Sequence, residues 1–263
     1  MDIQLIDTGF FHADGGAMFG AIPKTAWSRR YPSDKQNGCI LAMRSMLVRD
    51  GNGKIVLVDN GAGNKHLKQL SYYNFFDLVD LKDELQRRDV ACEDVTDVIL
   101  THLHFDHCGY TTQKEEQTGG KPLFKMAFPN AIHWVSRAQW ENFLHPNALE
   151  ADSYFIENMQ AVYDSGKLRL IENDTNLCPG IDLRLFDGHT PGQIAPYITT
   201  PERTYVFAGD VIPLAASVSP LWISAYDTYP VVSYNEKIAD AGRSASENRQ
   251  SSTVTTPILS VLP

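Results

Sequence analysis

The stretch THLHFDHCG gathers three of the chain's eight histidines around one aspartate. His102 and His104 are two residues apart, so on an extended backbone their imidazoles point to the same side and can bind one ion. Asp106 and His107 follow where a turn is expected, with Gly109 permitting the bend, and can face a second ion. Imidazole and carboxylate groups suit Zn²⁺, and less specifically Fe²⁺ or Mn²⁺.

The alternative interpretation is a solvated, histidine-rich turn without ligands. The apolar run DVILT leads directly into the cluster, which places it at the end of a predicted strand and favours the metal site. Cys108 lies inside the cluster, and we interpret it as a packing residue because a free cysteine is usually buried and inert.

Two further candidate ligands follow downstream. DGHTPGQ supplies His189, and VFAGD supplies Asp210, which is 21 residues further on. Each residue ends a strand-like run and has a neighbouring glycine. Alone, either motif would predict only a turn, but in this order after the histidine cluster both become candidate metal ligands.

The spacing H-x-H-x-D-H-x-G, with the later histidine and aspartate, resembles the metallo-β-lactamase superfamily over roughly residues 1–237. The resemblance implies an α/β fold, a four-layer αβ/βα sandwich with metals at one edge. It implies that His102, His104 and His189 are ligands of a first metal. It also implies that Asp106 and His107 are ligands of a second metal and that Asp210 is the bridging carboxylate.

The same resemblance implies a metallo-hydrolase with zinc, or with iron or manganese in its place. A water between two cations loses its proton near neutral pH, and the resulting metal-bound hydroxide is the expected nucleophile. Asp106 is the expected catalytic residue, because its carboxylate can orient that nucleophile and transfer a proton.

The segment DGGAMFGAIPKTAW near the N-terminus reads as a flexible loop with large apolar side chains. Met18, Phe19 and Trp27 are the candidate substrate contacts, and the alternative is that they pack on the core. The segment resembles the branch that holds N-acyl homoserine lactone lactonases, which are quorum-quenching enzymes, and organophosphate hydrolases. A lactone or another small ester is therefore the expected substrate.

Two departures from the family pattern bear on activity. Many lactonases of this branch carry a tyrosine shortly after the bridging aspartate, whereas GDVIPLAAS has none, and Tyr226 and Tyr229 come later. The superfamily usually adds another histidine well after that aspartate, yet none follows His189. Water, His145 or His133 could take its place. We therefore expect one tightly held metal, a weaker second one and low hydrolytic activity.

The C-terminal composition changes after YNEK. Ser233 and Glu236 fit a capping box that opens a helix, but the following residues are rich in serine and threonine and suit a disordered or poorly packed tail. We therefore predict a hydrolase domain over residues 1–237 and an atypical tail over 238–263. A divergent branch, or an altered reading frame near Ile238, would explain that tail.

The bulk composition limits the functional classes. The net charge of −9 argues against broad nucleic-acid binding, so a small-molecule substrate is expected. The four cysteines are widely spaced, and no signal peptide is apparent, so we expect a cytoplasmic protein. The sequence has no apolar run long enough for a membrane span. A homodimer is possible. A phosphoesterase or nuclease, an iron redox enzyme, and a degenerate metal-binding module are the alternatives to a lactonase.

Strands are interrupted regularly by helices along the chain, which favours layered α/β packing. Two β-prone runs around Gly51 and Gly53 predict a hairpin. Leu78, Leu81 and Leu85 have helical spacing. Further runs predict a strand in VTDVILTH, a strand in AIHWV, a helix N-capped by Ser136, and two strands in PYITTPERTYVFAGD.

Overall fold

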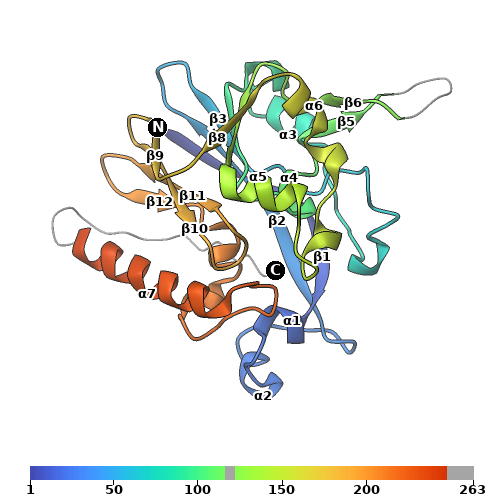
Figure 1. Cartoon of the computed structure of the whole chain (residues 1–263), viewed down its shortest axis with the longest axis vertical. Helices are drawn as coiled ribbons and strands as arrows, with labels where there is room; N and C mark the ends of the chain where they lie inside the picture. The colour runs from blue at the N-terminus through green and yellow to red at the C-terminus, as the bar shows by residue number, and fades with distance from the viewer. Residues whose placement is uncertain (116–121, 248–263) are drawn as a thin grey trace. The chain divides into compact units, whose positions relative to one another are not determined.

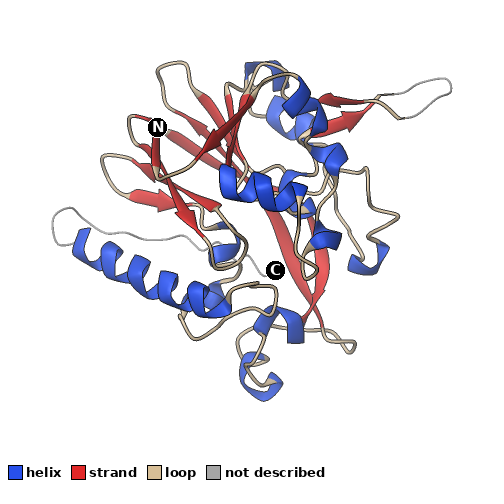
Figure 2. Ribbon diagram, in the orientation of Figure 1, coloured by secondary structure: helices blue, strands red, loops and turns tan. Residues whose placement is uncertain are grey.

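The computed structural model describes residues 1–115 and 122–247 (Figure 1). The chain divides into two compact units. Unit 1 comprises Met1–Phe11 and Leu41–Ile171. Unit 2 comprises His12–Ile40 and the chain from Glu172 onward. Both units combine strands with helices (Figure 2), as expected for the predicted α/β class. Among the described residues, no helix is both long enough and apolar enough to cross a membrane.

A six-stranded sheet forms the centre of unit 1. In spatial order its strands are β1 (Asp2–Asp14), β2 (Gly38–Arg49), β3 (Ile55–Val58), β4 (Asp97–Ile99), β7 (Ile132–Ser136) and β8 (Leu168–Ile171). β2 is antiparallel to β3, whereas β3, β4, β7 and β8 run parallel to one another. The second sheet of unit 1 pairs β5 (Thr112–Lys114) with β6 (Phe124–Met126). All residues of β4 are buried, as is typical of a parallel strand covered on both faces.

Helices of unit 1 share one hydrophobic core with this sheet. They are α3 (Leu81–Gln86), α4 (Phe105–Cys108), α5 (Arg137–Leu144) and α6 (Gln160–Asp164), with 3-10 turns η1 (Ser71–Tyr73), η2 (Cys92–Asp94), η3 (Ala151–Ser153) and η4 (Ile156–Asn158). Leu81 and Leu85 of α3 are fully buried, and Trp140 and Phe143 of α5 belong to the same core cluster. Helical spacing of apolar residues therefore marks the faces that pack inward.

Several local predictions in unit 1 are confirmed. β2 and β3 form the predicted hairpin, and its turn residues Gly51 and Gly53 have φ angles of 82° and 101°, a region that favours glycine. Ser136 caps α5 by accepting a hydrogen bond from the Gln139 N–H at 3.0 Å. α3 begins at Leu81, three residues later than Leu78, because the Asp80 side chain caps the helix there.

Unit 2 contains a four-stranded antiparallel sheet. In spatial order its strands are β12 (Thr204–Val206), β11 (Gln193–Thr199), β10 (Ile181–Phe186) and β9 (Thr175–Cys178). Its helices and 3-10 turns are α1 (Gly15–Phe19), α2 (Lys24–Trp27), η5 (Gly209–Val211), η6 (Ala215–Val218) and α7 (Pro230–Glu247). Phe186, Ala195, Tyr197 and Val211 form a buried core cluster under this sheet.

The N-terminal segment of unit 2 differs from the sequence prediction. A flexible loop was expected between β1 and β2, but the chain forms α1 and α2 there. The Asp14 carboxylate starts α1 by accepting hydrogen bonds from the Gly16 and Ala17 N–H groups at 2.7 and 3.1 Å. The helix cap is thus what orders a segment whose glycines suggested flexibility.

The predicted capping box at the start of α7 is wrong. α7 begins at Pro230, a residue suited to the first helical turn, so Ser233 lies inside the helix and its N–H bonds to the Tyr229 carbonyl at 3.0 Å. The Glu236 carboxylate instead accepts hydrogen bonds from the backbone N–H groups of Asp187 and Gly188 at 2.7 and 3.0 Å. Burial raises the pKa of Glu236. Through its two hydrogen bonds to the backbone of residues 187 and 188, the Glu236 carboxylate holds the loop after β10.

The predicted domain boundary at residue 237 falls inside α7. The helix continues to Glu247, so residues 238–247 of the predicted atypical tail are helical. Residues 248–263 lie outside the described residues, and with them the rest of the predicted atypical tail. The division into residues 1–237 and 238–263 stays a prediction.

Candidate metal centre

The histidine cluster of unit 1 lies in the loop after β4 and in the first turn of α4 rather than on a strand. β4 ends at Ile99, and His104 is the N-cap residue of α4. Gly109 closes this loop, and a Cβ atom there would lie 2.1 Å from the Ala62 carbonyl oxygen. No larger residue fits without moving the backbone, so Gly109 permits a close approach that fixes the loop beside residue 62.

Asp59, directly after β3, holds the loop between β4 and α4 through hydrogen bonds. Its buried carboxylate accepts hydrogen bonds from the Thr101 N–H at 2.7 Å, the Thr101 hydroxyl at 2.8 Å and His107 Nδ1 at 2.7 Å. Burial raises the pKa of Asp59, and the interactions with His107 and Thr101 oppose that shift. Because Nδ1 of His107 donates its proton to this carboxylate, the ring lone pair is at Nε2.

The hydrogen bond of His102 also assigns its tautomer. The Thr101 hydroxyl donates its hydrogen bond to Asp59. Its oxygen therefore accepts a hydrogen bond from His102 Nδ1, which lies 3.1 Å away. The lone pair of His102 is therefore at Nε2. His102 is fully buried, and its ring centroid lies 4.0 Å from that of His107.

His104 has the opposite tautomer. Its Nε2 lies 3.0 Å from the Glu150 carboxylate, which can only accept while it is ionised, so Nε2 donates and the lone pair is at Nδ1. The rings of His102 and His104 meet edge to face with centroids 4.5 Å apart, and ligand nitrogens of the two lie within 4.8 Å of each other. The loop thus gathers ring nitrogens whose lone pairs suit a metal.

Asp106 and His107 belong to the first turn of α4. His107 Nε2 lies 3.5 Å from Asp106 Oδ2. Two ligands of a tetrahedral zinc ion with bonds of about 2.0–2.2 Å lie roughly 3.4 Å apart. The separation in unit 1 therefore matches two ligands of one ion.

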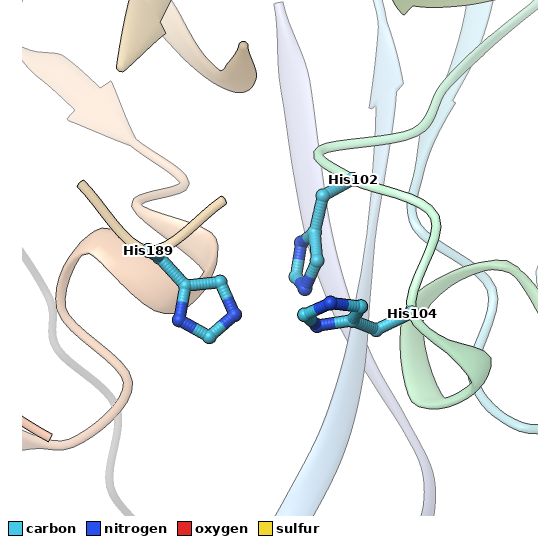
Figure 3. A group of neighbouring side chains, drawn as sticks. All are labelled: His102, His104 and His189. Carbon is cyan, nitrogen blue, oxygen red and sulfur yellow. The ribbon is translucent and has the colours of Figure 1, made fainter. Parts of the chain in front are cut away.

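Unit 2 carries a similar pair. His189 follows β10 and is buried, and its Nδ1 lies 3.1 Å from the Asp227 carboxylate, which assigns the lone pair to Nε2. His189 Nε2 lies 3.5 Å from Asp210 Oδ2, again the spacing of two ligands of one ion. Asp210 sits in η5 after Gly209, whose φ angle of 49° turns the chain at the end of β12. Figure 3 shows His189 together with His102 and His104, which lie in the loop before α4.

The donor set fits a divalent metal. In each of the four histidines one ring nitrogen is held by an acceptor, and the other carries the lone pair, which is the arrangement typical of metal-binding histidines. Nitrogen and carboxylate ligands suit zinc, iron and manganese. The predicted ligands, which are His102, His104, Asp106, His107, His189 and Asp210, stay predictions, and all of them except Asp106 belong to a group of side chains close enough to hold one ion.

The candidate substrate contacts are buried in unit 2. Met18 is 5% exposed, and Phe19 and Trp27 are each 1% exposed. Phe19 stacks on Trp27 with ring centroids 4.8 Å apart and meets Trp222 edge to face at 5.9 Å. This burial favours the packing alternative, and a substrate role for the three residues stays a prediction.

Cys108 matches its interpretation as a packing residue. Its thiol is fully buried and donates to the Leu103 carbonyl at 3.3 Å, and burial raises its pKa to about 12. The proposed substitutes for the missing histidine find no support. His133 lies within β7, and His145 is exposed at the end of α5. Neither joins a metal-type group among residues 1–115 and 122–247.

Three carboxylates that hold the imidazoles were not identified from the sequence. They are Asp59, Glu150 and Asp227. Asp59 had a local signal, because it follows the apolar strand IVLV and precedes a glycine by two residues. Glu150 and Asp227 lie 46 and 38 residues from the histidines they contact, so no spacing pattern marks them.

Comparison with known proteins identifies related sequences. The family profile of the Metallo-beta-lactamase superfamily matches residues 44–110. A curated N-acyl homoserine lactonase from a Bacillus species is 30% identical over 116 residues, which are 44% of this chain and 38% of that relative. Lactonase AiiA of Bacillus thuringiensis subsp. kurstaki is 28% identical over the same extent. The chain thus matches well under half the length of these curated relatives.

Solved structures match over nearly the whole chain. A probable metal-dependent hydrolase from Staphylococcus aureus is 31% identical, with a TM-score of 0.84 over 95% of this chain and 86% of that one. AidC, a dizinc quorum-quenching lactonase, is 19% identical, with a TM-score of 0.71 over 94% of this chain and 84% of that one. These likenesses confirm the predicted α/β sandwich fold.

Proposed function

Because the chain belongs to the metallo-β-lactamase superfamily of metallo-hydrolases, we propose that the protein opens a lactone or a related small ester. The observation that carries the proposal is the loop of unit 1, where four metal-type side chains lie beside a cluster of aromatic rings. The lactonases among the related proteins add support for this substrate class.

The proposed ligands are the six residues predicted from the sequence. His102, His104 and His189 would hold the first ion, Asp106 and His107 would hold the second, and Asp210 is a further proposed ligand. The tautomers described above support these roles, because each lone pair is assigned to one ring nitrogen. Zinc is the proposed metal, with iron and manganese as alternatives.

The second ion is proposed to bind more weakly than the first, and hydrolysis to be slow. No histidine follows His189 in the sequence, so the second ion has one imidazole, His107. Titration of metal-free protein with zinc tests this proposal. Two ions of similar high affinity would contradict it and would show that another residue fills the place.

The chemistry follows from the ligands and from Asp106. When bound, the metal would lower the pKa of a water to supply the nucleophile and would polarise the carbonyl oxygen of the lactone. The Asp106 side chain is 17% exposed, so its carboxylate can orient that water and take up a proton. It would then return the proton to the alkoxide oxygen that leaves the acyl carbon, which yields a hydroxy acid.

A cluster of aromatic side chains in unit 1, called the aromatic wall, favours a substrate with an apolar substituent. We define it by Phe11, Tyr73, Phe75 and Phe105. Phe105 directly precedes Asp106 and lies 5.1 Å from Tyr73 and 6.1 Å from Phe75 between ring centroids. Tyr73 and Phe75 are partly exposed, so apolar surface remains for a ligand. A charged phosphodiester gains little from such a surface.

A substrate panel tests the proposal. Zinc-loaded protein is assayed with an N-acyl homoserine lactone, a phosphotriester, a β-lactam and a phosphodiester. We expect the lactone to have the highest kcat/KM, and Asp106→Asn to lower kcat by roughly 10²–10⁴-fold. The exposed Asp152→Asn serves as the matched control. Cleavage of the phosphodiester with the lactone inert would favour the phosphoesterase or nuclease alternative.

Metal analysis of protein purified without chelator separates the remaining alternatives. Tightly bound iron with redox activity would indicate an iron redox enzyme. Bound zinc without turnover of any panel member would indicate a degenerate metal-binding module.

The protein is proposed to act in the cytoplasm on a small molecule, without nucleic acid or membrane partners. The four cysteines are widely spaced in the sequence, and the net charge is −9. A homodimer stays open, and sedimentation of the purified protein would decide it. Cell fractionation tests the location.

A further inference from the structure

Glu150 lies outside the proposed ligand set, yet its buried carboxylate is surrounded by polar partners. It follows α5 in the chain and is 4% exposed. Its carboxylate contacts four polar groups, which are Asn142 Nδ2 at 2.9 Å, Asn147 Nδ2 at 2.6 Å, the Tyr154 hydroxyl at 2.8 Å and His104 Nε2 at 3.0 Å.

The donors around Glu150 determine what His104 contributes. Amide nitrogens can only donate, and the Tyr154 hydroxyl also donates to this carboxylate. An ionised carboxylate can only accept, so the partner atom of His104 is an Nε2–H donor. A carboxylate in this position fixes the ring orientation and makes the other ring nitrogen a stronger metal ligand.

The same network also holds the backbone of the histidine loop. The Tyr154 hydroxyl lies 3.1 Å from Gln139 Oε1, and that oxygen accepts a hydrogen bond from the Leu103 N–H at 3.2 Å. The Tyr154 ring lies 4.9 Å from the His104 ring between centroids. Side chains on and after α5 therefore fix both the backbone before His104 and the orientation of its imidazole.

We propose that Glu150 is a positioning residue for metal binding, which acts through His104 and is itself held by Asn142, Asn147 and Tyr154. The proposal rests on the metal site of the proposed function but not on its substrate. Without Glu150, His104 loses the acceptor that selects its Nε2–H tautomer, and with it one of the contacts that orient the ring.

The test measures zinc affinity of the metal-free protein by competition with a chromogenic chelator. We expect Glu150→Gln to weaken zinc binding by about 10- to 100-fold. The substitution removes the negative charge, and it places the amide N–H donors of Gln against the N–H and O–H donors that now contact the carboxylate. Glu141→Gln is the matched control, since Glu141 is an exposed residue of α5. Its affinity should stay within about twofold of the wild type.

A second readout separates positioning from general stability. In metal-free protein labelled at histidine nitrogens, NMR should show His104 as the Nε2–H tautomer, and Glu150→Gln should introduce the Nδ1–H form. Tyr154→Phe removes only a hydroxyl and should weaken zinc binding by a few-fold; if Glu150→Gln does not fold, this variant decides.

Zinc affinity of Glu150→Gln, or of Tyr154→Phe in its place, equal to that of the control would overturn the proposal. An Nδ1–H tautomer of His104 in the wild type would overturn it as well. Lactone turnover by the zinc-loaded wild type decides the proposed substrate separately, so the two failures are distinguishable.

Discussion

Unit 1 and unit 2 hold their metal-type ligands in different ways. In unit 1, three histidines and one aspartate lie within six consecutive residues, in the loop after β4 and the first turn of α4. In unit 2, His189 and Asp210 are 21 residues apart and follow different strands, β10 and β12. β10 and β12 each pair antiparallel with β11 and so run in the same direction, and the segments that follow them leave the sheet at the same end of the strands. Local sequence groups the first set, whereas strand pairing groups the second.

The two units nevertheless use the same device to orient an imidazole. A buried carboxylate accepts a hydrogen bond from one ring nitrogen and leaves the lone pair on the other, namely Asp59 and Glu150 in unit 1 and Asp227 in unit 2. Such outer partners fix the tautomer and raise the basicity of the ligand. Changes to ligands and to these partners should therefore separate the contribution of each unit.

The largest effect is expected from unit 1 itself. His102→Ala combined with His104→Ala removes two of the imidazoles proposed for the first ion, so most bound metal should be lost on purification without chelator. Elemental analysis measures the metal-to-protein ratio, and His145→Ala, an exposed histidine of the same unit, is the control. An unchanged ratio in the double variant would mean that the site lies elsewhere.

Asp59→Ala should destabilise unit 1 more than any single change to an exposed carboxylate. It leaves two donors of Thr101 and one of His107 without their buried acceptor, at a cost of about 3 kcal/mol in unfolding free energy. Urea denaturation of metal-free protein measures the loss. Asp83→Ala, at an exposed position of α3, should change stability by less than about 0.5 kcal/mol. Equal losses in the two variants would contradict the anchoring role.

His133 gives unit 1 an acid sensitivity that does not depend on metal. Burial lowers its pKa from 6.5 to about 4. The unfolded chain therefore binds the proton more readily, and stability falls as the pH falls from about 6.5 to 4, by roughly 3 kcal/mol over the window. Metal-free His133→Leu should lose less stability across this range, measured by urea denaturation at each pH. An identical pH dependence in the variant and the wild type would refute the prediction, and exposed His145→Gln is the control.

The smallest effect is expected from the outer carboxylate of unit 2. Asp227→Asn keeps a hydrogen-bond acceptor for His189 but removes its charge, so zinc affinity should fall by about 10-fold, at the lower end for such partners. Chelator competition measures the affinity, with Asp182→Asn on β10 as the control. A loss as large as that of the double histidine variant would show that unit 2 dominates metal binding.

Much of unit 1 follows from short-range sequence patterns. The hairpin turn, the Ser136 cap and the apolar strands could be predicted because each depends on residues within a few positions of one another. The histidine cluster could be identified for the same reason. The predictions failed where a distant segment changed the local outcome, as at Glu236, which fits a capping box by spacing but instead bonds to the backbone of residues 187 and 188.

The sequence by itself determined the ligand types, their order and the α/β class, because side-chain chemistry and hydrophobic periodicity are written in neighbouring residues. Only the tertiary structure decided which ring nitrogen of each histidine carries the lone pair. That choice depends on Asp59, Glu150 and Asp227, which are 38 to 48 residues from the histidines they contact. A hydrogen bond over such a separation forms only once the sheets and helices have packed, so no local pattern encodes it.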